Sequence, residues 1–253
     1  MHAAKLLSIA TILLLIPIHS IVAAPGTSSG SPRSVELNER GVKLATMGKL
    51  AEAEKYFRQA LAVDHGNITA AFNLAGIYLR MSKAGAAIKL LKEYTVSYKE
   101  DAGLFARLGD AYFATKDLKH ARESYENALK LDPNYKGVHS KLATIMLMNN
   151  DLASAEKLLL RAAELDPSDE QVLANLASVF LATGKAEKAI STAKRALQIQ
   201  PSSDLYITLG SAYELLNDPA NALIAFKRAR DLGSKDKHLL SKISALEKIN
   251  SKG

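Results

Sequence analysis

The chain has 253 residues, of which 48% are hydrophobic, and a formal net charge of +7 at pH 7. This length and apolar fraction suit one or two folded domains with a buried core. The absence of cysteine excludes a disulfide scaffold, a Cys-ligated zinc site, a thiol nucleophile and an acylated lipoprotein cysteine.

The first residues follow the order of a secretory signal. Lys5 precedes the 11-residue apolar run Leu6–Ile16, and small residues follow at Ala23 and Ala24. This order predicts a signal peptide over 1–24 and export of the mature chain to the periplasm or beyond the cell. The alternative is an uncleaved anchor, although the run is shorter than the ~20 residues that a membrane span needs. Residues 25–33, rich in Gly and Ser, are predicted to be a flexible linker.

A strict period dominates the rest of the chain. Alanine recurs at spacings of 34, 34, 34, 34 and 33 residues, at Ala53, Ala87, Ala121, Ala155, Ala189 and Ala222. Twelve residues before each alanine stands a small residue, namely Gly41, Ala75, Gly109, Ala143, Ala177 and Gly210. Such self-similarity predicts stacked copies of one supersecondary unit.

Each copy is predicted to be a helical hairpin in which the small residue of the first helix faces the alanine of the second, so that the helix axes approach closely. Asp132-Pro133 and Asp166-Pro167 are expected to end second helices. Asp218-Pro219 is expected to begin one, as a cap followed by proline in the first turn. Mid-hairpin turns are expected at four places, namely Gly48, Gly85, Asn149-Asn150 and Gly184.

This pattern strongly resembles the tetratricopeptide repeat family. The resemblance implies an all-α fold, a right-handed superhelical solenoid of helix-turn-helix repeats. Six repeats are expected, at 34–67, 68–101, 102–135, 136–169, 170–202 and 203–236. Apolar residues at helical spacing then predict a capping helix and tail over 237–253. Tyr94 stands where all five other repeats carry alanine, and this predicts an altered joint between the second and third repeats.

The resemblance also places a binding groove on the first helices of the repeats. Positions that face this groove in the family carry a polar row, Asn73, Arg107, Lys141 and Asn175, and an apolar row, Leu79, Phe113, Leu147 and Leu181, with Phe72 beside them. We expect these rows to lie outside the hairpin core and to bind an extended or helical protein segment with some acidic character. Asn73 and Arg107 match two of the five places of the family's carboxylate clamp, but Asn38, Val42 and Gly103 do not, so that function is rejected.

No catalytic pattern stands in a structural context that fits it. The G-x-S-x-G match at Gly26–Gly30 lies in the predicted linker rather than between a strand and a helix. The histidines lack metal-ligand spacing, and Asn67-Ile68-Thr69 is interpreted as a chance glycosylation sequon. We therefore expect no enzyme activity, no cofactor, no metal and no nucleic-acid partner, and membrane association only if the N-terminal segment is retained.

The sequence leaves three functions open. The first is a scaffold exported to the bacterial envelope that helps to assemble a pilus, secretion or polysaccharide-export complex. The second is an adaptor for cell-wall or anionic polymers, since residues 227–253 hold eight Lys or Arg against three acids. The third is an oligomeric scaffold that assembles from copies of itself.

Overall fold

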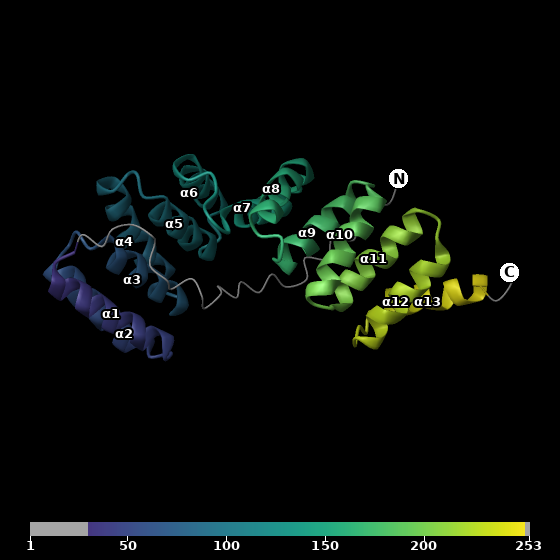
Figure 1. Ribbon diagram of the computed structural model, residues 1–253, viewed down its shortest axis with the longest axis horizontal. Helices are drawn as coiled ribbons and strands as arrows, with labels where there is room; N and C mark the ends of the chain where they lie inside the picture. The colour runs from purple at the N-terminus through teal and green to yellow at the C-terminus, as the bar shows by residue number, and fades with distance from the viewer. Residues whose placement is uncertain (1–29, 251–253) are drawn as a thin grey trace. The chain divides into compact units, whose positions relative to one another are not determined.

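The computed structural model describes residues 30–250, with the side chains of residues 249 and 250 left aside (Figure 1). The predicted signal peptide, the linker up to residue 29 and residues 251–253 lie outside this range. The described chain divides into two compact units, and the division falls between Val138 and His139. Each unit is considered by itself below.

The described residues are all helical apart from short turns, which confirms the all-α, tetratricopeptide-like prediction. The helices of the first unit are α1 (Pro32–Thr46), α2 (Leu50–Val63), α3 (Ile68–Arg80), α4 (Ala84–Ser97), α5 (Ala102–Ala114) and α6 (Leu118–Leu131). Those of the second unit are α7 (Val138–Met148), α8 (Leu152–Leu165), α9 (Glu170–Ala182), α10 (Ala186–Ile199), α11 (Ser203–Leu215), α12 (Pro219–Asp231) and α13 (Lys237–Asn250). Helix α1 thus begins two residues before the first expected repeat.

Several helices begin at a short polar side chain that caps the first turn. Asp117, Asp151 and Asp218 each accept a hydrogen bond from the backbone N–H three residues later, and so satisfy a donor that the helix leaves open. Pro219 stands in the first turn of α12, as expected from the sequence. Helices α6 and α8 end directly before Asp132-Pro133 and Asp166-Pro167, which confirms those stop signals.

The turn inside each hairpin uses one left-handed residue at the same place in every repeat. These residues are Gly48, Ser82, Lys116, Asn150, Gly184 and Asn217, with φ between 55° and 78°. The prediction of a turn at Gly85 is wrong. Gly85 lies in the first turn of α4, and Ser82 takes the left-handed conformation instead. Position in the repeat therefore outweighs residue type at this turn.

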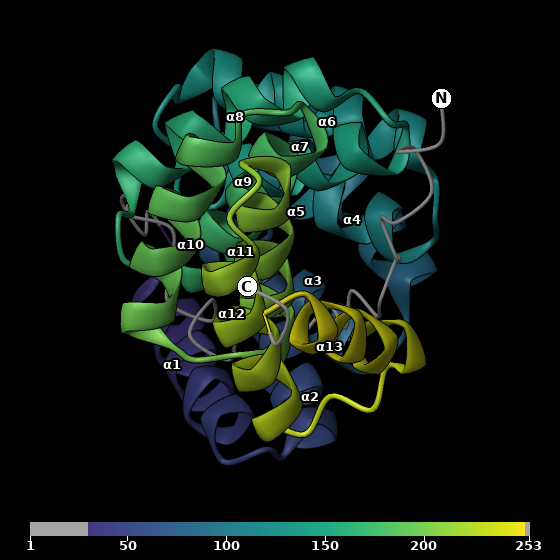
Figure 2. The ribbon, with the colours of Figure 1, turned by 90° about the vertical axis from the view of Figure 1, so that its right-hand side faces the viewer.

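Consecutive helices pack against each other from α1 to α6 in the first unit and from α8 to α13 in the second (Figure 1). Some odd-numbered helices also touch, α1 against α3 and α3 against α5 in the first unit, and α9 against α11 in the second. Helices α1, α3 and α5 thus form one layer in the first unit, and α9 and α11 lie side by side in the second. Helix α13 lies against α12 (Figure 2), where Leu239, Ile243 and Leu246 join Phe226 in one buried cluster. It covers the apolar surface of the last hairpin, as expected of a cap.

In three hairpins, the glycine of the first helix packs against an aromatic ring of the second helix. A Cβ on Gly41 would lie 2.6 Å from the ring of Phe57, and a Cβ on Gly109 or Gly210 would lie 2.5 Å from Tyr125 or Phe226. Where the first helix carries alanine instead, as at Ala75 and Ala143, the partner position holds Leu91 and Leu159, which are fully buried. A small residue on the first helix thus leaves room for a large partner on the second, whereas the fifth repeat carries alanine at both positions, Ala177 and Ala193.

Tyr94 fits the fold despite its size. Its side chain is 1% exposed, and its hydroxyl donates to the backbone carbonyl of His65 at 2.7 Å, in the turn between α2 and α3. Burial raises the pKa of Tyr94 to about 12, so the phenol stays protonated and keeps this bond. The tyrosine therefore joins the second hairpin to the preceding turn.

Candidate functional site

In the first unit, the predicted groove residues come from the layer of odd-numbered helices. Helix α3 supplies Phe72, Asn73 and Leu79, and α5 supplies Arg107 and Phe113. Phe72 and Leu79 are seven residues apart, which is two helical turns, so they lie on one face of α3. Both belong to the hydrophobic core of this unit, with 6% and 8% of their surface exposed.

Asn73 is engaged with the neighbouring repeat. Its amide Nδ2 donates to Oδ1 of Asn38 on α1 at 3.0 Å, and both side chains are buried. The Asn73 Oδ1 atom is buried without a hydrogen-bond partner within residues 30–250. This pair joins α1 to α3 in the layer of odd-numbered helices.

The Arg107 side chain extends from α5 to contact α3, as Asn73 extends from α3 to contact α1. Its guanidinium carbon lies 4.1 Å from the centre of the Phe72 ring and rests against Gly76, where a Cβ would come within 3.7 Å of it. Nη1 of Arg107 lies 3.8 Å from Oδ2 of Asp110, whose Oδ1 accepts a hydrogen bond from the Tyr125 hydroxyl at 2.9 Å. Burial, with the nearby Asp110 charge, raises the pKa of Tyr125 well above its usual value, so this donor stays protonated.

The expectation that the groove rows lie outside the core is therefore wrong for Phe72, Asn73, Leu79 and Arg107. Arginine is seldom buried, but here the guanidinium is stabilised by a ring face and a carboxylate. Of the predicted residues in this unit, only Phe113 is half-buried and keeps part of its surface for a partner.

The predicted groove residues of the second unit are more accessible. Lys141 and Leu147 lie on α7, Asn175 and Leu181 lie on α9, and all four are half-buried. Asn175 Oδ1 accepts a hydrogen bond from Gln171 Nε2 at 3.2 Å, whereas its own Nδ2 makes no hydrogen bond within residues 30–250. This face offers apolar surface beside an amide donor.

The sequence analysis did not predict an ion pair that recurs in two places. In each, a glutamate on an even-numbered helix binds the lysine that directly precedes the next even-numbered helix. Lys83 donates to Glu54 at 2.8 Å, and Lys185 donates to Glu156 at 2.7 Å, with each carboxylate side chain only 15–16% exposed. The hydrogen bond from Lys83 lowers the pKa of Glu54. The signal was present in the repeat, since both glutamates directly follow the periodic alanine and both lysines occupy one register position.

The polar atoms of the Asn67 side chain are used within the fold. Asn67 is 2% exposed, and its side chain both caps α3 and donates to the Ser34 hydroxyl, so the amide nitrogen of the Asn67 sequon is not accessible in the fold. Among residues 30–250, no group of three or more His, Asp or Glu side chains is placed to hold a metal ion. Within the same range, no helix is both long and apolar enough to cross a membrane.

Comparison with known proteins finds curated relatives that match less than half of the chain. RNA polymerase II-associated protein 3 of Mus musculus is 32% identical over 116 residues, covering 43% of this chain and 16% of the relative. The Hsp70-Hsp90 organising protein of Plasmodium falciparum is 30% identical over 116 residues, covering 43% of each chain. The chain thus spans less than half the length of these curated relatives.

Solved structures show the same fold at low identity. PilF of Pseudomonas aeruginosa superimposes with a TM-score of 0.72 at 15% identity, covering 85% of this chain and 96% of that one. YrrB, described as a TPR protein with an unusual peptide-binding site, gives a TM-score of 0.67 at 19% identity, covering 76% and 97%. The family model described as the C-terminal domain of cilia and flagella-associated protein 70 matches residues 23–245. The chain therefore belongs to this family of tetratricopeptide repeat domains, which are scaffolds for protein–protein interaction.

Proposed function

We propose that the protein is a non-catalytic scaffold, exported to the bacterial envelope, that binds a segment of a partner protein on the groove face of its second unit. The observation that carries the proposal is the difference between the two units. Predicted groove residues of the first unit are mostly buried in its core, whereas Lys141, Leu147, Asn175 and Leu181 are all half-buried. A partner that lies on α7 and α9 would complete the burial of the two leucines.

The polar groups on this face indicate the chemistry of the partner. The Asn175 Nδ2 group has hydrogen-bonding capacity that the described fold does not use. A backbone carbonyl or a carboxylate of the partner would accept from it, and the positive charge of Lys141 favours a carboxylate nearby. An extended or helical segment with alternating apolar and acidic residues fits this face.

The envelope location rests on the N-terminal sequence alone. Lys5, the apolar run Leu6–Ile16 and the small residues at Ala23 and Ala24 support export. The names of the curated relatives do not refer to the envelope. Assembly of a pilus, secretion or polysaccharide-export complex would be one role for such a scaffold.

The two alternative functions gain no specific support. The basic C-terminal segment is partly neutralised, since Lys227 pairs with Glu247, Arg230 with Asp231 and Lys242 with Glu214. This pairing weakens its attraction for an anionic polymer. The residues of α13 opposite its buried face include Lys237, Ser241 and Ser244, which are exposed and polar, so this end does not favour stacking of copies.

Affinity capture from extracts of the source cells, followed by a binding isotherm with the partner so identified, tests the proposal. Leu181→Asp should weaken binding by about tenfold or more if the leucine is an anchor residue. The matched control is Ile199→Asp, which places the same charge at an exposed position on α10 of the same unit. Equal affinity of both variants and the wild type would exclude this face, and thermal melts would show that each variant is folded.

Export is tested separately by cell fractionation and by the mass of the mature chain. The proposal predicts a chain that lacks its first 23 or 24 residues and is recovered outside the cytoplasm. Full-length protein found only in the cytosol would contradict it.

A further inference from the structure

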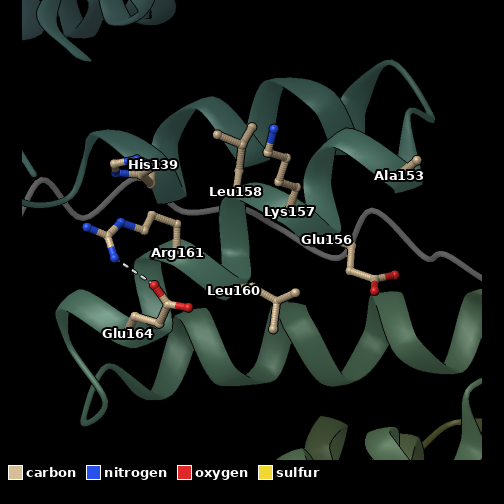
Figure 3. Close-up of a pocket in the computed structure, with 8 residues that line it drawn as sticks. All are labelled: His139, Ala153, Glu156, Lys157, Leu158, Leu160, Arg161 and Glu164. Atoms are coloured by element: carbon tan, nitrogen blue, oxygen red, sulfur yellow. Dashed lines mark hydrogen bonds and ion pairs between the residues drawn. The ribbon is translucent and has the colours of Figure 1, made fainter. Parts of the chain in front are cut away.

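A notch of about 520 Å³ opens on α8 in the second unit, away from the proposed groove (Figure 3). Its wall contains His139 near the start of α7, and Leu158, Leu160 and Arg161 from α8. The volume lies within the range of small-ligand and side-chain sites. Leu160 is 42% exposed, so the notch offers apolar surface to a partner.

His139 is the unusual member of this wall. The same register position in the other repeats holds Leu37, Ala71, Phe105, Leu173 and Tyr206. His139 is 8% exposed, and its Nδ1 is buried without a hydrogen-bond partner within residues 30–250. Burial and the nearby Arg161 charge lower the pKa of His139, so the imidazole is neutral at neutral pH and can donate from Nδ1 in one of its tautomers.

Two cations, Lys157 and Arg161, and two carboxylates, Glu156 and Glu164, line the notch. Arg161 lies beside His139 and binds Glu164 at 2.6 Å (Figure 3). Glu156 lies at the other end of the notch and accepts a hydrogen bond from Lys185 at 2.7 Å. Lys157 is exposed and makes no ion pair within the described residues. Both carboxylates of the notch are therefore already engaged, whereas the Lys157 ammonium is not.

We propose that this notch binds an acidic side chain of a partner protein together with an adjacent apolar side chain. The carboxylate accepts a hydrogen bond from His139 Nδ1–H and lies within the field of Lys157 and Arg161. The apolar neighbour packs on Leu160, which is exposed beside Lys157 and Arg161. The site faces α8 and is independent of the groove on α7 and α9, so either could exist without the other.

The test is histidine-selective NMR of the full chain with a dipeptide probe, N-acetyl-Leu-Glu-amide, and its neutral analogue N-acetyl-Leu-Gln-amide. The His139 signal, assigned with His139→Gln, should shift saturably with the acidic probe, and the neutral analogue should bind about tenfold more weakly. Lys157→Gln should weaken binding of the acidic probe, and Arg195→Gln, an exposed cation on α10, should not.

A second variant separates binding from folding. His139→Phe copies the residue at the matching position, Phe105, and should keep the fold while losing the acidic probe. No saturable shift, or equal affinity for the two dipeptides, would overturn the proposal. Binding of acetate alone with the affinity of the dipeptide would also overturn it, because the notch would then be a small-anion site without a role for the apolar neighbour.

Discussion

Substituting Gly41 with alanine should destabilise the protein, although alanine is the better helix former. The added Cβ would lie 2.6 Å from Cε1 and 2.8 Å from Cδ1 of Phe57, whereas ordinary contacts are 3.4–4 Å. Phe57 is fully buried and cannot swing aside. Overpacking of this kind costs about 1–3 kcal/mol, and the gain in helix propensity returns only about 1 kcal/mol.

The double variant Gly41→Ala with Phe57→Leu should remove the clash. It reproduces the Ala75–Leu91 pair of the next repeat, in which both residues are fully buried. Phe57→Leu alone should cost about 1–2 kcal/mol, because it leaves a cavity. The double variant should be more stable than the sum of the single effects predicts, by roughly 1–3 kcal/mol.

Urea unfolding of the wild type, both single variants and the double variant measures this coupling as a thermodynamic cycle. Comparison of the slopes shows whether all four chains unfold in the same way. Additive effects, or a Gly41→Ala chain as stable as the wild type, would refute the glycine–aromatic account of hairpin closure.

Three further outcomes follow from the fold. Ser82→Gly should raise the free energy of unfolding by about 1 kcal/mol, because glycine adopts the left-handed turn without strain, and an unchanged melting temperature would contradict this. Ala155→Leu should cost about 1–3 kcal/mol in urea unfolding, since Ala155 has no exposed surface, and an unchanged midpoint would refute its close packing. The lowered pKa of Glu54 means that its ion pair with Lys83 stabilises the fold above pH 4.5 and that this contribution is lost as the pH falls through the folded-state pKa. The difference in urea midpoint between wild type and Glu54→Gln should therefore be larger at pH 7 than at pH 3, and an equal difference at both would be inconsistent with this linkage.

The repeat architecture was predictable because one period governs every level of the fold. The same spacing sets the helix ends, the left-handed turns and the small positions of the hairpins. The turn at Ser82 shows the limit of local reasoning, since serine has no strong preference for a left-handed backbone and only its place in the repeat indicates the turn. The prediction of the turn at Gly85 rested on residue type alone, and it was wrong.

The candidate site was less predictable because burial depends on neighbours from other repeats. Arg107 reads as an exposed groove donor, yet Phe72, Gly76 and Asp110 together make a place for its guanidinium inside the layer. His139 likewise reads as one histidine among six, and its burial follows from a register position that is apolar or aromatic in the other repeats. Neither arrangement follows from spacing alone.

The central claim is that a partner segment lies on the odd-numbered helices of the second unit. Hydrogen exchange of the full chain, with and without the partner identified by capture, tests it most directly. The account predicts added protection in α7 and α9, around Lys141–Leu147 and Asn175–Leu181, with α10 and α12 unchanged. Protection confined to α10, α12 and α13, with none in α7 and α9, would contradict it.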